Sequence, residues 1–414
     1  MSLWSPDWQI LIDGVDYSSS TVANLTITRG RSNIYEQPVA GYCYVQLVDV
    51  VQDSFDITVG QQILINLKNS AGNWIGVYGG YISDVNTSVV SSGSTAQVIG
   101  YNITALGALS RLSRATFNDS LAKDDEGAQI YQIVSEVVAQ DWNEVPTEIT
   151  WANYTPATTQ WLDAGNVGLG TIDTGVYEMV ARAADAVNAY TYVAQLADSA
   201  LGTIYEDDLG RIAYDNQDHR QDYLLANGFT SLSANAAYGV GISTQTLSGY
   251  MRNDLTVVYK NGQTVNEIDT DSINNFGQYS EIISTTLELE ADATALAERL
   301  ILLRSFPRPI LNAISYPLGN TELDAVDRDA LIDIFVGQPI ELTDLPPAIS
   351  STPYQGYVEG WTIQAGFNSV TLTFILSPLS YSGYWQRWEQ VNAAETWNSV
   401  LNTLEWQDAI GVIS

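Results

Sequence analysis

The sequence predicts an α+β protein that is rich in β-strands and contains several domains. Its 414 residues are enough for two to four domains, each with a core of its own. Hydrophobic residues make up 45% of the chain and charged residues only 15%, which is typical of packed globular proteins. The 24 Tyr and 11 Trp far outnumber the 3 Met, and short runs of β-branched residues end at Gly, Asn or Asp. This usage favours strands over long helices.

The segment from Trp8 to Tyr101 has the pattern of one β-rich domain. Strands are expected at 41–50, 62–67 and 77–90, the last with a break at Gly79 and Gly80. Cys43 is the only cysteine, so it cannot form a disulfide within the chain, and we expect it to be a small core residue of the first strand. Leucines at three-residue intervals predict a short amphipathic helix within 105–114.

Two helices separated by a long loop are expected next. Asp124 and Asp125 suit the start of a helix, and apolar residues follow them at helical spacing. Residues 147–175 are rich in Thr, Gly, Asn and Trp without a clear period, so we expect a loop there. Helical spacing resumes over 176–199.

The remainder of the chain adds two hairpins, a helix and a closing strand. Turns rich in Asp, Asn and Gly indicate the hairpins. The first joins strands at 203–206 and 211–215, and the second has a strand at 255–259 followed by a turn at Asn261-Gly262. A helix is expected over 291–304, where it ends before Pro307. The last strand, 369–376, alternates large apolar residues with Thr, which predicts a sheet with one buried face.

The charge balance argues against binding to nucleic acid. With 16 Lys and Arg against 48 Asp and Glu, the formal net charge is -32, which repels phosphate groups. No apolar run is long enough to span a bilayer, and the first residues lack the pattern of a secretory signal. We therefore expect synthesis in a cytoplasm, with no direct DNA binding and no membrane span.

The residues that most often carry chemistry are scarce. His219, the only histidine, lies in a polar stretch and is expected to be a solvated surface residue. One His and one Cys exclude a zinc site built from several such ligands. The segment 267–271 resembles the start of a calcium loop, with acidic residues at Glu267, Asp269 and Asp271. The residues that follow do not fit an EF-hand. We predict no catalytic, cofactor or metal site.

Two further patterns have ordinary structural explanations. Gly165, Gly168 and Gly170 hint at a phosphate loop, yet Asp173 stands where a third glycine would fall, so loop flexibility explains them better. The densest acidic cluster, Glu206, Asp207 and Asp208, falls in a predicted hairpin turn. Asp is expected at such a turn for local hydrogen bonding.

Several sequence segments of the chain together indicate a resemblance to a known family. Residues 192–220, YVAQLADSALGTIYEDDLGRIAYDNQDHR, run from a helix into a hairpin and end on a basic residue. Residues 272–277 precede the helix 291–304 and Pro307, and the segments 331–342 and 356–379 read as closing strands. In this order the segments resemble those of the hub, or minor tail, proteins of bacteriophages, which are related to the baseplate hubs of contractile tails. The resemblance spans most of the chain.

The resemblance implies a fold and an assembly. Family hubs are trimers in which two tube-like β domains per subunit, barrels or sandwiches, form a pseudo-sixfold ring that joins the hexameric tail tube to a threefold tip. The implied division is 1–115 for the first ring-forming domain, 116–238 for a helical and hairpin lobe, 239–330 for an α+β lobe, 331–382 for strands that complete the second ring-forming domain, and 383–414 for a Trp-rich arm.

The same resemblance implies the partners and the place of the protein. The partners are further copies of the chain, the distal tail or tail tube protein, the tape measure protein, and tip or fibre proteins. The protein would belong to a virion tail that is assembled in the host cytoplasm. A ring that lets DNA pass also suggests that the surplus of acid lines the conduit, although acid spread over all solvated faces for solubility is an equal alternative.

The chain departs from the family at the loop 147–175 and at the Trp-rich arm, and the arm keeps alternatives open. Its aromatic surface predicts docking on another subunit or partner through Trp385, Trp388, Trp397 and Trp406, and packing on its own domain is an equal alternative. The same residues suit a tail adhesin or a distal tail protein that binds host carbohydrate. A tail-associated cell-wall hydrolase would need two carboxylates at catalytic separation, and the sequence selects no such pair.

Overall fold

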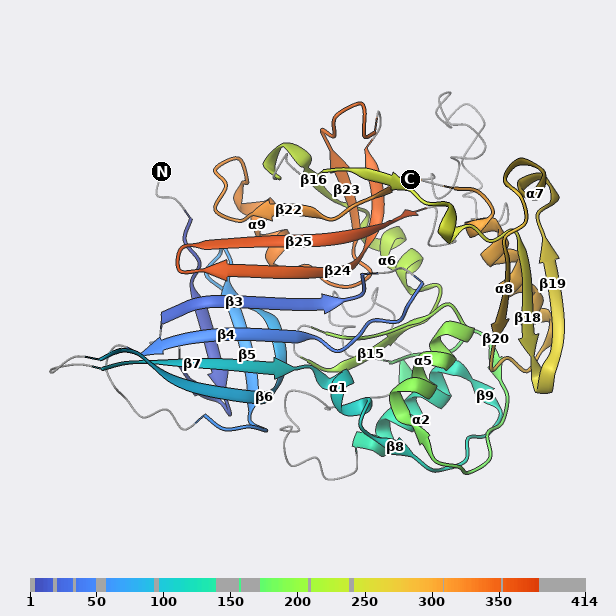
Figure 1. The fold of residues 1–414 in the computed structure, drawn as a ribbon, viewed down its shortest axis with the longest axis horizontal. Helices are drawn as coiled ribbons and strands as arrows, with labels where there is room; N and C mark the ends of the chain where they lie inside the picture. Colours follow the sequence, from blue (N-terminus) through green and yellow to red (C-terminus); the bar gives the residue numbers. More distant parts are fainter. Residues whose placement is uncertain are drawn as a thin grey trace.

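The structure is a computed structural model that describes most of the chain. The described residues are 4–17, 21–32, 35–49, 57–92, 97–138, 156–157, 172–207, 210–237, 242–307, 309–350 and 353–379. They form a large sheet at one end of the molecule, a helical lobe beside it and an outer lobe at the other end (Figure 1). None of the described helices is long and apolar enough to cross a membrane.

The large sheet has twelve strands among the described residues. They are β1 (Trp8–Ile12), β2 (Val15–Asp16), β3 (Thr21–Gly30), β4 (Tyr42–Asp49), β5 (Gln62–Lys68), β6 (Trp74–Ser92), β7 (Gln97–Leu106), β16 (Thr230–Ser233), β22 (Ile314–Pro317), β23 (Pro339–Thr343), β24 (Tyr354–Gly366) and β25 (Ser369–Pro378). The order along the sheet is β16-β23-β24-β3-β4-β7-β6-β5-β1-β2, and β25 pairs with β24 and β22. Apart from the parallel pair β16 and β23, the neighbours are antiparallel. The β-rich fold class predicted from the sequence is therefore confirmed.

The early and late strands of the chain meet in this sheet. β24 pairs with β3 in antiparallel register, from Gly360 opposite Gly30 to Gly366 opposite Asn24. One hydrophobic core is shared by both parts, with members such as Ile27 from β3 and Phe374 from β25. The predicted limits of the two ring-forming domains, 1–115 and 331–382, stay a prediction.

The alternating pattern of the last strand is confirmed. In β25 the large apolar residues Val370, Leu372, Phe374 and Leu376 are buried, whereas the threonines between them are partly exposed. Cys43 in β4 is also confirmed as a core residue, since its exposed fraction is 0%. Both results follow from the two-residue period of a strand, which sends alternate side chains into the core.

The break predicted at Gly79 and Gly80 is wrong, because β6 runs through both residues without interruption. Gly80 instead allows another chain segment to approach closely, and Gly210 allows its own segment to approach Gly79. A Cβ on Gly80 would lie 2.5 Å from the carbonyl oxygen of Leu106, and a Cβ on Gly210 would lie 2.5 Å from the carbonyl oxygen of Gly79. The register of β6 shifts further along, between Ile82 and Asp84.

The helical lobe and the outer lobe share a second hydrophobic core, with members such as Ile133 and Leu296. The helical lobe contains α1 (Ala108–Leu112), α2 (Glu126–Val138), α5 (Ala189–Ser199), β8 (Thr116–Phe117), β9 (Asp124–Asp125), β10 (Pro156–Ala157), β11 (Ile172–Asp173), β12 (Glu178–Met179), β13 (Val187–Asn188), β14 (Thr203–Glu206) and β15 (Ile212–Asp215). The helix start predicted at Asp125 is confirmed, since its Oδ1 accepts a hydrogen bond from the Ala128 N–H at 2.7 Å. The predicted hairpin is confirmed as β14 and β15.

Two predictions for this lobe need correction. The helix expected over 176–199 begins only at Ala189, because β12 pairs with β9 and β13 pairs with β8. Met179 is buried, but it lies in the strand β12. The spacing of apolar residues alone does not distinguish such a buried strand from a helix. The loop expected over 147–175 lies largely outside the described residues. Of its described residues, 156–157 and 172–173 form the strands β10 and β11, and 174–175 have no regular structure.

The outer lobe consists of a three-stranded sheet covered by a helix. The sheet has the order β19-β18-β20, with β18 (Asp254–Tyr259), β19 (Gln263–Ile268) and β20 (Ser280–Ser284), and α8 (Glu290–Arg304) packs on it (Figure 1). The predicted hairpin and helix are confirmed, and the turn has positive φ angles of 58° at Asn261 and 90° at Gly262. α7 (Thr270–Phe276) is capped by Asp269, whose Oδ1 accepts from the Ser272 N–H at 2.9 Å. The carboxylate considered for calcium thus acts as a helix cap.

Short elements connect these parts. They are α6 (His219–Asn227), α9 (Ala325–Ile332), the paired strands β17 (Thr244–Thr246) and β21 (Pro309–Leu311), and the 3-10 turns Ala234–Ala236, Ser248–Tyr250 and Lys260–Gly262. α6 lies between the helical lobe and the large sheet, where Tyr223 packs edge-on against Phe335 with ring centroids 5.3 Å apart. Its first two residues belong to the site described next.

Candidate functional site

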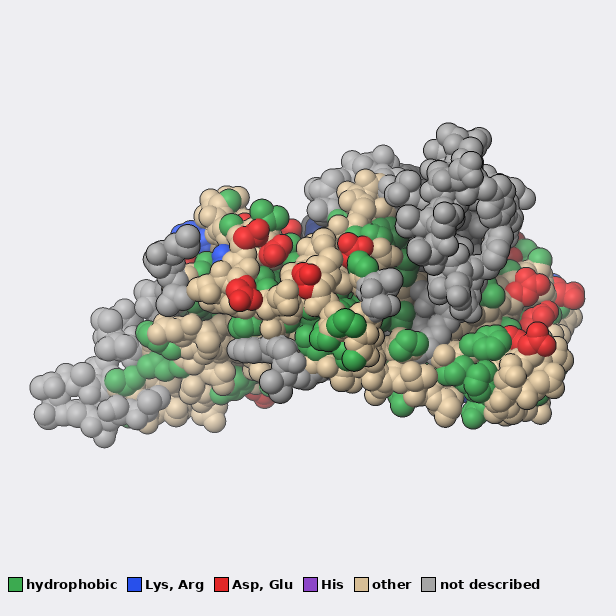
Figure 2. Space-filling view, turned by 90° about the horizontal axis from the view of Figure 1, so that it is seen from above, with side chains coloured by type: hydrophobic (Ala, Val, Ile, Leu, Met, Phe, Trp, Pro, Cys, Tyr) green, Lys and Arg blue, Asp and Glu red, His purple; other side chains and the backbone are tan. Residues whose placement is uncertain are grey.

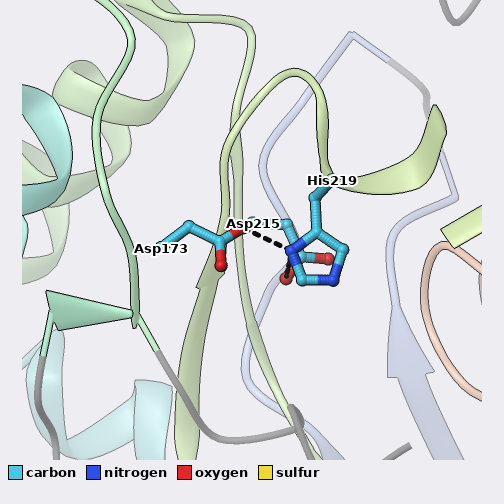
Figure 3. Close-up of side chains that lie close together, drawn as sticks. All are labelled: Asp173, Asp215 and His219. Atoms are coloured by element: carbon cyan, nitrogen blue, oxygen red, sulfur yellow. Dashed lines mark hydrogen bonds and ion pairs between the residues drawn. The ribbon is translucent and has the colours of Figure 1, made fainter. Parts of the chain in front are cut away.

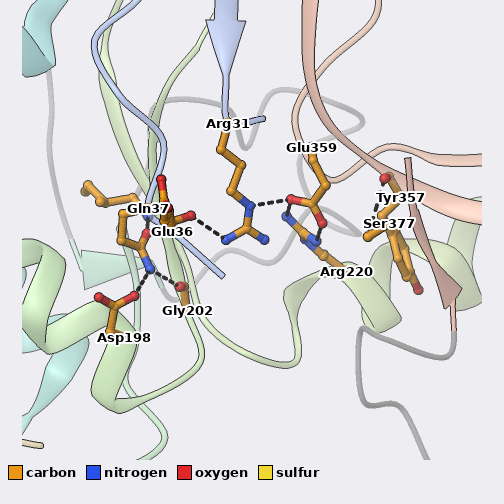
Figure 4. Close-up of polar contacts among 10 residues, drawn as sticks. Arg31, Glu36, Gln37, Asp198, Gly202, Arg220, Tyr357, Glu359 and Ser377 are labelled. Carbon is orange, nitrogen blue, oxygen red and sulfur yellow. Dashed lines mark hydrogen bonds and ion pairs between the residues drawn. The ribbon is translucent and has the colours of Figure 1, made fainter. Parts of the chain in front are cut away.

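A network of buried charges connects the large sheet to the helical lobe. Glu359 of β24 is 1% exposed and lies between two arginines (Figure 4). Arg31, just after β3, donates from Nε at 2.6 Å, and Arg220 of α6 donates from Nη1 and Nη2 at 2.7 and 3.2 Å. Burial by itself would raise the pKa of Glu359, but Arg220 and Arg31 outweigh it and lower the pKa to about 2. Glu359 is therefore ionised at neutral pH and joins three separate elements.

The residue before Arg220 forms a second part of the network. His219 Nδ1 contacts Asp173 Oδ2 at the end of β11 and lies 3.4 Å from Asp215 Oδ1 at the end of β15 (Figure 3). One ring nitrogen of His219 and one carboxylate oxygen from each aspartate all lie within 4.8 Å of one another. The prediction of a solvated surface histidine is wrong, because His219 is 6% exposed. We call these residues, with Arg31, Arg220 and Glu359, the charged junction.

The two aspartates change the protonation of His219. Burial would lower the pKa of His219, but Asp215 and Asp173 outweigh it, so the pKa is raised above its ordinary value. Burial raises the pKa of Asp215 to about 7, against the opposing effect of His219 and Arg220. The arrangement suits a protonated imidazole whose Nδ1 lies between two carboxylates.

Glu206 corrects another prediction from the sequence. It lies in β14 rather than in the turn, it is 6% exposed, and its carboxylate accepts hydrogen bonds from the backbone N–H of Gly41 at 2.9 Å and of Leu109 at 2.5 Å. A Cβ on Gly107 would lie 1.9 Å from Oε2 of Glu206. The carboxylate therefore joins the start of α1 to the large sheet and needs a glycine beside it.

Asp207, by contrast, does what the turn prediction expects. Its Oδ1 accepts a hydrogen bond from the backbone N–H of Arg211 at 2.8 Å, and its Oδ2 forms an ion pair with Nε of the same residue at 2.5 Å. Nη1 of Arg29 donates to the carbonyl oxygens of Glu206 and Asp207. Asp208 lies outside the described residues.

Beside the charged junction is a cleft of about 320 Å³. Its polar lining includes four arginines and three carboxylates, Arg31, Arg220, Arg299, Arg304, Asp198, Glu281 and Glu359. Each carboxylate already has a partner: Asp198 accepts from Gln37 at 2.7 Å, Glu281 pairs with Arg304 at 2.8 Å, and Glu359 lies between its two arginines. These contacts hold the carboxylates in fixed positions at the meeting point of the sheet and both lobes.

The residues that the sequence singled out and those that the structure assembles are mostly different. Trp385, Trp388, Trp397 and Trp406, the predicted docking residues, lie outside the described residues. Arg31 and Glu359 were missed because they are far apart in sequence and each lies among strand residues without a motif. Arg220 was visible only as the basic end of the segment 192–220, and Asp173 only as an interruption of a glycine pattern.

Comparisons with known proteins give the class of this fold. The fold is that of bacteriophage tail proteins. The 43 kDa tail protein of prophage MuSo2 from Shewanella oneidensis aligns over 90% of this chain and 99% of its own length, with a TM-score of 0.53 and 12% identity. A tail protein from Neisseria meningitidis MC58 aligns over 92% of this chain and all of its own length, with a TM-score of 0.59 and 7% identity.

The likeness is one of structure and not of sequence. No family model matches the sequence, and no curated protein does. At 7% and 12% identity, individual side chains are not carried over, so residue roles rest on the contacts in this chain. The predicted resemblance to tail proteins is confirmed at the level of the fold.

Proposed function

We propose that this chain is a structural component of a bacteriophage tail tip, a hub that forms a threefold ring and catalyses no reaction. The observation that supports the proposal most is the extent of the structural likeness, because two tail proteins align over nearly their whole lengths with at least 90% of this chain. In this role the ring joins the hexameric tail tube to a threefold tip and lets DNA pass. Its partners are the distal tail or tail tube protein, the tape measure protein, and tip or fibre proteins.

The charged junction supports a role that needs a rigid shape. Glu359 and its two arginines join β3, β24 and α6, and His219 joins α6 to the ends of β11 and β15. Buried ion pairs with fixed partners specify one arrangement of the elements that carry them. In a ring subunit, these contacts would keep the lobes in position when neighbouring subunits attach.

Labelling of particles tests this proposal. Antibodies raised against the purified chain would be applied to phage particles from cells that carry the gene, and their position would be read by negative-stain microscopy. The proposal predicts label at the end of the tail that is distant from the capsid. Label on the capsid, label along the whole tube, or particles without the chain would contradict it. Antibodies adsorbed with the purified chain serve as the control.

A further inference from the structure

The cleft beside the charged junction concentrates positive charge in an acidic protein. Four of the chain's 16 basic residues line it, against three carboxylates, although the whole chain has a formal net charge of -32. A low-dielectric wall around such a group strengthens its attraction for anions. Within the described part of the chain, the cleft therefore suits an acidic ligand.

Two of the arginines keep donors available in the cleft. Arg304 is 7% exposed and donates from Nε to Tyr250 O and from Nη1 to Glu281, and Arg31 donates from Nε to Glu359 and from Nη1 to Glu36 O. Within the described residues, no hydrogen bond involves Nη2 of either arginine. A carboxylate in the cleft would accept charge-assisted hydrogen bonds from these two groups.

The cleft also has an apolar wall. Ile283 of β20 and Leu300 and Leu303 of α8 line it together with Leu201. Guanidinium groups beside aliphatic side chains suit a ligand in which a carboxylate stands next to a large apolar group. A volume of about 320 Å³ is at the lower end for ligand sites, so it accommodates a short stretch of chain.

The sequence after β25 has this chemistry. Ser377, near the end of β25, lines the cleft, and residues 380–414 follow it with four tryptophans, four acidic residues and one arginine. The first place where a tryptophan adjoins a carboxylate is Trp388 and Glu389. Trp388 is eleven residues beyond Ser377, a stretch that extends up to roughly 36 Å, so the pair reaches the cleft.

We propose that the cleft is the docking site for Trp388 and Glu389 of the same chain, with the carboxylate on Arg31 and Arg304 and the indole on the apolar wall. Of the two alternatives for the Trp-rich arm, its own subunit is favoured because the tether gives an effective concentration of roughly millimolar. The proposal does not depend on the function of the protein as a tail hub.

Amide hydrogen exchange of the full-length chain, followed by mass spectrometry, tests the docking. We expect peptides around Trp388 to exchange more slowly than in the isolated synthetic peptide 380–414. Ile283→Glu places a negative charge on the cleft wall and should increase exchange around Trp388 by about tenfold, which corresponds to about 1.4 kcal/mol. Ile282→Glu is the matched control, because it makes the same change one residue away on the exposed side of β20, where Ile282 is 73% exposed.

Variants in the arm keep the test independent of the fold of the cleft. Trp388→Ala and Glu389→Gln should each release the segment around position 388, whereas Trp406→Ala and Glu405→Gln, the same changes at the later Glu-Trp pair, should leave its exchange slow. Added salt should accelerate exchange in the native chain, because it screens the contact with the arginines.

Three results would overturn the proposal. They are exchange around Trp388 as fast as in the free peptide, exchange that stays slow in Ile283→Glu and Trp388→Ala, and slow exchange that disappears on dilution of the native chain. The last result would show that the arm docks on a second copy, since docking within one chain does not depend on concentration.

Discussion

At the scale of single residues, Glu359 is the central charge of the charged junction. It is 1% exposed, it is ionised, and it accepts hydrogen bonds from arginines on two different elements. Burying three charges is unfavourable unless each is compensated by the others. Removal of the central charge leaves two buried guanidinium groups without their counter-ion.

Glu359→Gln should therefore lower the free energy of unfolding by about 3–5 kcal/mol, the range for breaking a buried ion pair on one side. Urea unfolding followed by fluorescence measures the change. Glu322→Gln removes a negative charge from an exposed position and should stay within about 0.5 kcal/mol of the native chain. Equal effects of the two substitutions would mean that Glu359 does not hold the junction together.

His219 gives the junction a dependence on pH. Its pKa is raised by Asp215 and Asp173 after burial has opposed them, so its contribution to stability is fully present below the unfolded pKa of about 6.5 and is lost as the pH rises through the folded pKa. The raised pKa of Asp215 acts in the same direction, because this carboxyl ionises at a lower pH in the unfolded chain than in the folded chain, so stability falls as the pH rises from about 4 to about 7.

The stability difference between the native chain and His219→Asn should be largest below about pH 6.5 and should shrink as the pH rises above the raised pKa of His219. Urea unfolding at a series of pH values measures this difference, and the asparagine variant supplies the reference without a titrating imidazole. A difference that stays constant over this range, or grows with pH, would rule out a protonated His219 between the two aspartates.

At the scale of elements, the sequence correctly predicted the helices, strands and turns that are determined by a few neighbouring residues. The turn at Asn261-Gly262, the start of α2 after Asp125 and the strand β25 are all confirmed, because φ preference, capping and alternation act over a few residues. The predictions failed where a distant segment decides. Met179 is in a strand because β9 pairs with β12, and Gly79 lies within β6 because it pairs with Leu64 of β5.

The candidate site could be predicted even less well, for the same reason. Glu206 was expected in a turn because acidic residues cluster there, yet its partners are the N–H groups of Gly41 and Leu109, far away in sequence. His219 was expected in solvent because its neighbours are polar, and those neighbours turn out to include its buried partner Asp215. Polarity of a segment shows which groups need partners, and only the fold shows whether water or protein supplies them.

Gly107 tests the connection between α1 and Glu206. Its φ angle is -78°, so alanine meets no backbone strain there, but the added Cβ would overlap the Glu206 carboxylate. Gly107→Ala should lower the free energy of unfolding by about 1–3 kcal/mol, as expected for overpacking. The control is Gly319→Ala, where no heavy atom lies within 4 Å of the added Cβ. A neutral Gly107→Ala would show that Glu206 can move away without loss.

At the scale of the whole molecule, the charge of -32 needs a physical cause. Figure 2 shows acidic side chains both over the large sheet and at the end formed by the outer lobe. We predict that in the assembled ring the carboxylates face the axis, because a conduit lined with negative charge repels DNA phosphates and does not retain them. An electron-microscopy map of the ring measures this directly. A neutral or positive axis with an acidic outer wall would leave solubility as the better explanation.

The central claim is that this chain forms a threefold ring at the tail tip. Single-particle electron microscopy of purified tail tips, processed without imposed symmetry, tests this claim most directly because it counts the copies of the chain around the axis. The account predicts three copies, each contributing two tube-like β domains to a pseudo-sixfold wall. One copy per tip, or six copies of this chain in a ring of their own, would contradict it.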